Sequence, residues 1–562
     1  MSFQALSPVA ESDLVVAKPL APRLDTLTGK TIGLFASFKE HWVYILEEVG
    51  RQLQAKFDDV KLTRFRYRKD LNAYTNVAEV GKDPDEGPKF EKWLQTTDAV
   101  IVANADAGSC TLYLSFNASM VERLGKPGVM TLQSQYLPLA KTAFSLRGVP
   151  NMRTVDIDLY DISMEPDLSQ FYRTVLPGKV SAALDGIIHA LTAPPQPDEA
   201  EPAQPAPAPA SEIISGSLQE INDEFYRRGW APGAPIIPPT AELVASMCAA
   251  VELAPDTVVG RIPPREGKAT VEKIAINAVM AGCLPTHMPV LVAAVQAITA
   301  PGIWSEAYTT SMASWMPMLI INGPIRGDID VNCDTSYMSP YNRANACIGR
   351  ALGLIIMNVS GVRAKVEDMG VVGHEGHFGV CFGEHEEASP WEPMHHFYGL
   401  QPGDSAVTAF FPNTRLIGPG INDAGLVLRA ICDDLPAMGF DPGCAVIFTP
   451  TTARVLADAG MSRKDVAEYI VEYARRPASQ MNVRWMRGNQ HDLGLVQLPL
   501  DPSRSARKIY STAHIPVLVA GNRNAVGTAL YGGGGDHGGP ITKKIELPRN
   551  WAELVERYKA VR

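Results

Sequence analysis

The chain has no long apolar run, no excess of basic residues and no clustered cysteines, and each absence excludes a class of protein. No hydrophobic stretch in the 562 residues approaches the roughly 20 residues that a membrane-spanning helix needs. The formal net charge of −10 argues against nucleic acid or an anionic membrane as a partner. The eight cysteines are scattered singly, which is typical of reduced thiols rather than of a disulfide framework.

The composition is that of a globular protein with more than one core. Hydrophobic residues make up 46% and charged residues 20% of the chain. Its length exceeds one ordinary core, so two or three domains are expected. Residues 1–24 lack a basic start followed by an apolar core, so we expect no signal peptide and a cytoplasmic location. A homo-oligomer is compatible with such large apolar domains.

A stretch rich in proline and alanine marks the clearest domain boundary. It reads APPQPDEAEPAQPAPAPA over Ala193–Ala210, a composition that cannot bury a core and favours an extended spacer. We therefore divide the chain into a flexible tail (1–29), an N-terminal domain (30–192), the linker (193–212) and a larger domain (213–562).

Both domains are predicted to be α/β. In the N-terminal domain, strand-like runs such as 31–36 and 99–104 alternate with helical patterns such as 41–57. This alternation predicts a doubly wound parallel sheet, in which ligands bind at the carboxyl ends of the strands. The larger domain has longer helical patterns and is predicted to be mixed α/β, with a loop-rich region over 359–413.

One thiol lies where a strand pattern meets a helix pattern. The apolar run that starts at Asp98 leads into Gly108-Ser109-Cys110-Thr111, and a helical pattern follows. The orphan N–H groups and the dipole of a helix N-terminus favour negative charge, so a thiol there tends toward the nucleophilic thiolate. Gly108, Ser109 and Thr111 could also bind an anionic substrate group. The alternative is a buried cysteine in a turn that only caps the helix.

The segment 373–387 is dense in potential ligands and acids. His374, His377 and Cys381 are residue types that bind zinc or iron, although the intervening glycines prevent a helix from fixing the two imidazoles. Glu384 and Glu387 are candidates for a general acid or base. The alternative is a partly solvated acidic group with no metal.

Polar residues also follow a predicted buried strand and precede a predicted helix. Asn322 and Arg326 come after the strand, and Asn342 and Arg343 come before the helix. Arginine binds carboxylates and phosphates through two parallel hydrogen bonds, so these residues are candidates for recognising an anion. Alternatively, Asn342 caps the helix.

A glycine-rich run near the C-terminus carries one further candidate acid or base. His537 lies beside Asp536 within Tyr531–Gly539. The run lacks the Lys-Ser/Thr ending of a phosphate-binding loop, so it does not favour a nucleotide site. A surface loop is the alternative.

The turn Ala107-Gly-Ser-Cys110 resembles the motif of the UGSC family, which is named for selenocysteine or cysteine followed by Gly-Ser-Cys. The larger domain resembles the protein that commonly accompanies this family. The resemblance implies that two partners are fused in one chain. Ala107 replaces the first selenocysteine or cysteine, so the resemblance leaves Cys110 as the only sulfur, whether it acts as a nucleophile, pairs across domains or only binds substrate. The similar stretches of the larger domain are Val271–Cys283, Asn322–Arg326, Asn342–Ala351 and Ser389–Pro393.

Three hypotheses for function follow. The leading one is a thiol-dependent enzyme, of the oxidoreductase or lyase/hydrolase class, acting on a small anionic organic substrate at the interface of the two domains. Cys110 would be its nucleophile or redox thiol, with no cofactor required. The second is a metal-dependent hydrolase or lyase centred on His374, His377 and Cys381, which needs a divalent metal. The third is a non-catalytic binding protein, because two α/β domains with a cleft also describe binders.

Overall fold

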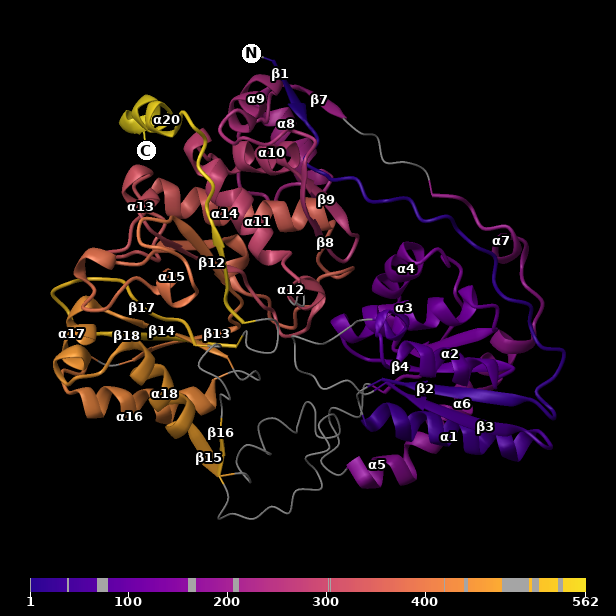
Figure 1. The fold of residues 1–562 in the computed structure, drawn as a ribbon. Helices are drawn as coiled ribbons and strands as arrows, with labels where there is room; N and C mark the ends of the chain where they lie inside the picture. Colours follow the sequence, from indigo (N-terminus) through magenta and orange to yellow (C-terminus); the bar gives the residue numbers. More distant parts are fainter. Residues whose placement is uncertain are drawn as a thin grey trace.

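The structure is a computed structural model and contains two α/β regions joined by extended segments (Figure 1). Among the helices it describes, none has the length and apolarity to cross a bilayer. The described residues are 2–37, 40–67, 79–159, 168–205, 212–301, 303, 305–418, 420–438, 443–477, 505–507, 515–533 and 539–561.

A parallel sheet of five strands forms the N-terminal domain, as the alternating pattern predicts. The strand order is β3-β2-β4-β5-β6, and all four pairings are parallel. The central strand β4 is buried along its whole length because helices cover both faces of the sheet. The strands are β2 (Thr31–Ala36), β3 (Lys61–Arg66), β4 (Ala99–Ala105), β5 (Gly128–Leu132) and β6 (Thr154–Asp156).

The helices of this domain lie on opposite faces of the sheet (Figure 1). Helices α1 (Glu40–Lys56) and α6 (Leu176–Thr192) pack together on one face, and α3 (Gly108–Arg123) and α4 (Leu137–Leu146) pack on the other. The strand order reverses direction between β2 and β4. In a doubly wound sheet, the crevice outside the carboxyl ends of two such strands is the usual ligand site.

The larger region contains a helical layer on a four-stranded mixed sheet. Helices α10 (Val271–Ala281), α11 (Met288–Ile298) and α14 (Arg343–Ser360) pack against one another. The sheet has the order β11-β10-β12-β19, in which only β10 and β11 are parallel. Its strands are β10 (Met318–Asn322), β11 (Val380–Gly383), β12 (Ala406–Phe410) and β19 (Ile541–Lys544).

A second four-stranded sheet completes the larger region, with the order β13-β18-β14-β17. Helices α16 (Ala424–Asp434), α17 (Pro450–Asp458) and α18 (Arg463–Tyr473) accompany it. The segment 359–413, predicted to be rich in loops, therefore also supplies two buried strands, β11 and β12. The strands of the second sheet are β13 (Thr414–Gly418), β14 (Cys444–Phe448), β17 (Val517–Val519) and β18 (Thr528–Gly532).

Residues 2–29 differ from the flexible tail expected for this end of the chain. Strand β1 (Phe3–Leu6) pairs antiparallel with β7 (Ile213–Gly216), which follows the linker. Further along, the N–H of Lys18 donates to the carbonyl of Gly148, 2.8 Å away. The partners of β1 and Lys18 lie more than a hundred residues away in sequence, so no local pattern could reveal them.

The proline-rich linker is likewise attached to the N-terminal domain over its first part. A short helix, α7 (Pro197–Ala200), places Glu199 beside Arg153, whose guanidinium donates to both carboxylate oxygens. Gln204 and Ala17 exchange two hydrogen bonds of 3.0 Å. The N-terminal segment and the first part of the linker, up to Gln204, therefore run side by side (Figure 1).

A buried ion pair anchors the N-terminal segment to the sheet. Arg23 donates to Glu122 at 2.8 Å, and the same carboxylate accepts from the backbone N–H groups of Ala21 and Gly128. Both side chains are at most 2% exposed. Burial raises the pKa of Glu122, and Arg23 counteracts this shift.

We predict that Arg23→Ala lowers the free energy of unfolding by about 3–5 kcal/mol, because it leaves a buried carboxylate without its counter-charge. Arg51→Ala is the matched control, since Arg51 pairs with Glu48 while 63% exposed and should change stability by no more than about 1 kcal/mol. Urea unfolding of the full chain measures both variants. Equal effects would contradict the anchoring role of Arg23.

Candidate functional site

The reversal point of the N-terminal sheet carries a histidine–carboxylate pair that sequence reasoning missed. His41 lies in the first turn of α1, just after β2, and Asp106 directly follows β4. The Nε2 atom of His41 contacts the Oδ2 atom of Asp106, and both side chains are nearly buried. Because β2 and β4 are adjacent parallel strands, the two residues meet at one edge of the sheet. Sequence proximity could not show this, since 65 residues separate them.

Cys110 lies at the same edge, as the third residue of α3. The N-cap residue is Ala107, whose side chain has no oxygen to accept from the first N–H groups of the helix. The hydroxyl and the backbone N–H of Thr111 both donate to the carbonyl of Ala107. Cys110 is 8% exposed. The helix therefore begins without a side-chain cap, its first turn carries the thiol, and Asp106 of the His41–Asp106 pair lies just before it.

The first turn of α3 is pressed against the larger domain. A methyl group on Gly108 would lie 1.7 Å from the carbonyl oxygen of Thr310, the last residue of α12 (Ser305–Thr310). Only glycine permits this approach. Met369 packs on an apolar cluster of α3 and α4 that includes Leu112 and Phe116. The C-terminal carbonyl end of α12 thus faces the N-terminal N–H end of α3. The dipoles of the two helices favour this arrangement.

Helix α12 contributes Glu306 to this contact, a carboxyl group whose pKa is raised. Burial raises the pKa of Glu306 to about 7. The pKa of Tyr113, on α3, is raised well above its ordinary value by burial and then by the nearby Glu306 and Cys110. Helices α12 and α3 are in contact, so charged groups of both domains act on this one phenol. The sequence offered no local signal for Glu306.

The contact between the domains is completed by a buried carboxylate. Glu367 is fully buried and accepts from Arg265 at 2.6 Å and from the hydroxyl of Thr142, on α4, at 3.1 Å. The hydroxyl of Tyr136 lies 3.1 Å from the sulfur of Met312. Polar and apolar contacts thus hold α4 and the residues just before it against the larger domain, beside the helix α3 that carries Cys110.

The predicted acid Glu384 lies elsewhere, fully buried within the larger domain. Its carboxylate accepts from Asn322 at 2.5 Å, from the N–H of Met394 at 2.7 Å and from Arg463 at 2.8 Å. Three donors therefore engage both oxygens. This geometry suits an internal anchor, and it explains why the strand-end residue Asn322 points at an acid rather than at solvent.

Backbone bonds from Glu384 and its neighbour join the two sheets of the larger domain. The N–H of Glu384 donates to Ile321, on β10, and the N–H of His385 donates to Val519, on β17. The distances are 3.0 and 2.7 Å. The carboxyl ends of strands from both sheets therefore meet at residues 384–387.

The predicted anion-binding residue Arg326 is already paired with acids at this meeting point. Its guanidinium donates to both oxygens of Glu387, at 2.8 and 3.2 Å, and lies 2.9 Å from Glu386. The hydrogen bond from Arg326 is the largest cause that lowers the pKa of Glu387 to about 2. Glu387 is therefore ionised at neutral pH and suits a ligand or ion-pair role better than that of a general acid.

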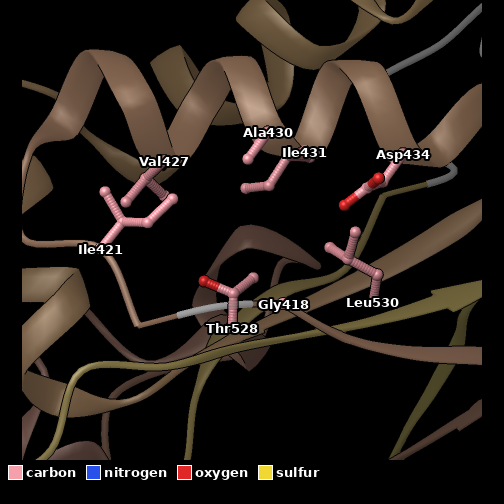
Figure 2. Close-up of a pocket in the computed structure, with 8 residues that line it drawn as sticks. All are labelled: Gly418, Ile421, Val427, Ala430, Ile431, Asp434, Thr528 and Leu530. Carbon is pink, nitrogen blue, oxygen red and sulfur yellow. The ribbon is translucent and has the colours of Figure 1, made fainter.

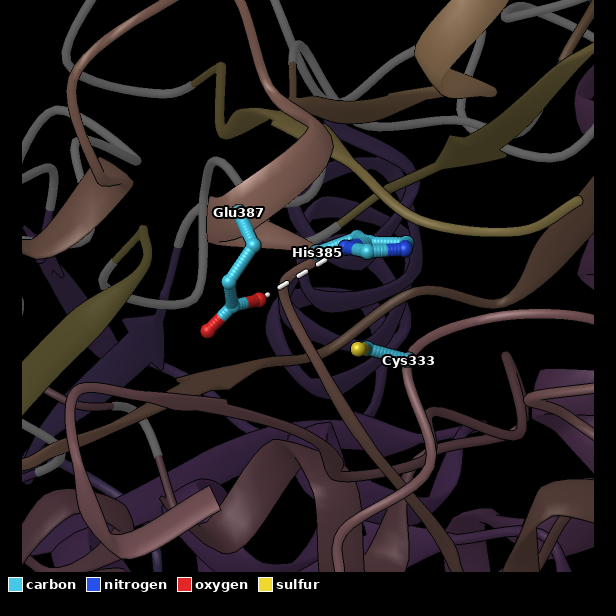
Figure 3. A group of neighbouring side chains, drawn as sticks. All are labelled: Cys333, His385 and Glu387. Atoms are coloured by element: carbon cyan, nitrogen blue, oxygen red, sulfur yellow. Dashed lines mark ion pairs between the residues drawn. The ribbon is translucent and has the colours of Figure 1, made fainter. Parts of the chain in front are cut away.

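Three side chains at this point come close enough to share a ligand, as Figure 3 shows. Candidate ligand atoms of Cys333, His385 and Glu387 all lie within 4.8 Å of one another. Cys333 belongs to the loop after α13 (Ile325–Asp328), and the other two lie just after β11. Sequence reasoning singled out Glu387 and included His385 in the ligand-dense segment 373–387 without giving it a role, and it gave no role to Cys333.

The predicted metal ligands His374, His377 and Cys381 do not form such a group among the described residues. The Nδ1 atom of His374 accepts from the N–H of Gly376, and a ring nitrogen of His377 lies 2.8 Å from the carbonyl of Trp315. Cys381 is buried in β11, and burial raises its pKa. Backbone contacts occupy the two imidazoles, and the strand faces the thiol into the core.

The remaining predicted residues contact backbone. Asn342 caps α14 by accepting from the N–H of Asn345, which is the alternative that its position left open. Arg343 donates to the carbonyls of Val561 and Gly282. His537 lies outside the described residues. In Figure 1, α3 and β17 lie well apart, so Cys110 and the group around Glu384 are separate places in the molecule.

A small pocket between α16 and the second sheet contains none of the predicted site residues (Figure 2). Aliphatic side chains form most of its wall, and Asp434 is its one carboxylate. The lining residues are Gly418, Ile421, Val427, Ala430, Ile431, Asp434, Thr528 and Leu530.

The fold and the edge residues together define a doubly wound α/β domain that carries a thiol where its strand order reverses. Residues 4–167 match the model of the UGSC family, which supports the resemblance seen in the Ala107–Cys110 turn. The match does not extend to the larger domain. No curated protein and no solved structure matches the chain.

We predict that Gly108→Ala separates the two domains at α3, because the added methyl group cannot coexist with the Thr310 carbonyl. The variant should lose unfolding cooperativity between the domains and become sensitive to proteolysis in the linker. Gly178→Ala, on α6 and with open space around the new methyl, is the control and should be neutral or slightly stabilising. Limited proteolysis of both variants measures this, and equal cleavage would contradict the close contact.

We predict that Glu306→Gln changes how stability depends on pH. A carboxyl whose pKa is raised from 4.5 to about 7 favours the folded state below pH 4.5, and this contribution is lost as pH rises to about 7. The glutamine variant should lack that loss, which amounts to about 1.4 kcal/mol per pKa unit. Chemical unfolding between about pH 5 and pH 8 measures the difference. Glu553→Gln, at an exposed position, should retain the wild-type slope.

Proposed function

We propose that the chain is a thiol-dependent enzyme in which Cys110 acts as nucleophile on a small anionic organic substrate at the junction of the two domains. The observation that supports this best is the position of Cys110. It is the third residue of a helix that lacks a side-chain cap, at the reversal point of a doubly wound sheet. Helix dipoles lower the pKa of thiols at such positions.

The groups around Cys110 fit the steps that such a reaction needs. His41 receives the thiol proton, and Asp106 orients the imidazole and stabilises its charged form. Backbone N–H groups of Gly108 and Ser109 hold the anionic part of the substrate. Thr111 takes no part, since its hydroxyl is bonded to Ala107.

Glu306 supplies a proton to the leaving group from the opposite domain. A carboxyl with a pKa of about 7 is well matched to general acid catalysis at neutral pH. Because this group comes from α12, neither domain has the full set of residues by itself. This supports the further proposal that residues 213–562 are the larger partner protein fused to the family domain.

The alternatives have less support. A metal-dependent reaction at His374, His377 and Cys381 would require those side chains to leave their present contacts. A binding protein would retain its ligand without turnover and would not need a reactive thiol. We retain a small-molecule partner rather than nucleic acid, and a cytoplasmic location, on the charge and thiol content of the chain.

The proposal predicts that iodoacetamide alkylates Cys110 faster than thiols of equal exposure. Cys248 and Cys283 are matched internal controls, because each is also 8% exposed and burial raises the pKa of both, that of Cys248 to about 11. We expect Cys110 labelling to persist below pH 7 and to slow about tenfold or more in Asp106→Asn. Mass spectrometry of the full chain measures all three sites at once.

Labelling of Cys110 no faster than Cys248 and Cys283 would exclude a stabilised thiolate and the nucleophile role with it. An unchanged rate in Asp106→Asn would remove the His41–Asp106 pair from the proposal.

A further inference from the structure

We propose that Cys333, His385 and Glu387 bind a divalent metal ion of the zinc class in the larger domain. This site is separate from Cys110 and from the residues predicted as metal ligands. Thiolate, imidazole and carboxylate are the three ligand types that zinc takes in proteins. Figure 3 shows the three side chains converging from two loops, with the carboxylate of Glu387 directed toward His385.

The spacing of the ligand atoms fits one ion. The Nδ1 atom of His385 lies 3.6 Å from the Oε2 atom of Glu387. Tetrahedral zinc with bonds of about 2.0–2.2 Å separates a nitrogen and an oxygen ligand by about 3.4 Å. The sulfur of Cys333 lies within 4.8 Å of its two counterparts, so small side-chain movements would complete the geometry.

An unsatisfied nitrogen points into the same space. His385 is 3% exposed, and its Nδ1 atom is buried with no hydrogen-bond partner among the described residues. Leaving a buried polar atom without a partner costs about 1–3 kcal/mol. A metal ion bound to Nδ1 removes that cost. The ion pairs of Arg326 with Glu386 and Glu387 leave Nδ1 without a partner.

The other ring nitrogen, Nε2, accepts a hydrogen bond from Arg523 and has a carboxylate, that of Asp334, within reach. Nε2 of His385 lies 3.6 Å from Asp334, and Arg523 lies 3.0 Å from Nε2 and 3.2 Å from Asp334. In the structure Arg523 donates to Nε2, which leaves the ring proton on Nδ1. Metal on Nδ1 moves that proton to Nε2, which then donates to Asp334, so Arg523 gives up its bond to Nε2. Arg523 keeps its bond to the same carboxylate. Asp334 is therefore a positioning residue for the site.

Arg326 competes with a metal ion for the carboxylate of Glu387. Its second acidic partner, Glu386, allows Arg326 to remain paired when the metal binds. The guanidinium bonds both oxygens of Glu387 and also lies 2.9 Å from Glu386. Metal binding takes one oxygen of Glu387, while Glu386 still neutralises Arg326. The Glu387 side chain is 68% exposed, so the fourth metal position opens to solvent, as in zinc sites that hold a water molecule.

Cobalt(II) tests the proposal, because a cobalt–thiolate bond gives a charge-transfer absorption band in the near ultraviolet. The full chain, reduced and stripped of metal by a chelator, is titrated with Co²⁺. We expect one Co²⁺ per chain, the thiolate band, and displacement of the cobalt by Zn²⁺. Cys333→Ser should abolish the band. Glu387→Gln, at an exposed position, and Asp334→Asn should each weaken binding by about tenfold to a hundredfold.

Two matched controls make the assignment specific. Cys347→Ser removes another half-buried thiol of the same domain, and His374→Ala removes the histidine that the sequence favoured; both should keep the band and the affinity. Circular dichroism verifies that each variant is folded. The proposal is overturned if the chain binds no stoichiometric Co²⁺, if the band is absent, or if it survives Cys333→Ser.

Discussion

The close approach of the Gly108 backbone to the Thr310 carbonyl is the constraint on which the junction of the two domains depends. It sets the start of α3 against the end of α12, so the position of Cys110 relative to the larger domain is fixed by main-chain atoms. Side-chain contacts then follow, with Met369 covering the apolar surface of α3 and Glu306 placed near Tyr113. Because main-chain atoms define this junction, position 108 tolerates few substitutions. The side-chain contacts around it, such as that of Met369, can accommodate more.

A different constraint organises the larger domain. Successive N–H groups, those of Glu384 and His385, bond to strands of two different sheets, and the Glu384 carboxylate is held by three further donors. This junction places His385 beside Cys333 and Glu387. Each domain thus has its chemistry-bearing residues where strand ends meet another structural unit, since strand ends leave polar groups that must find partners.

Several features followed from local sequence pattern. The alternation of strand and helix in residues 30–192 gave the doubly wound sheet, and the small-residue turn located Cys110 at a helix start. The Asn342 cap was one of two alternatives that its position allowed. Strand β11, with the sequence Val-Cys-Phe-Gly, was missed because it is short, ends in glycine and shows no alternation. The ordered N-terminal segment was missed because its partner strand lies beyond residue 212.

The sequence by itself determined the fold of the N-terminal domain, its family motif and the place of Cys110 on its helix, because periodicity and turn residues act over a few positions. Only the tertiary structure decided which distant groups meet: His41 with Asp106, Glu306 with α3, and His385 with Cys333. These encounters depend on strand order and on the packing of one domain against the other. Both are set by the burial of whole elements, which no local window of residues records.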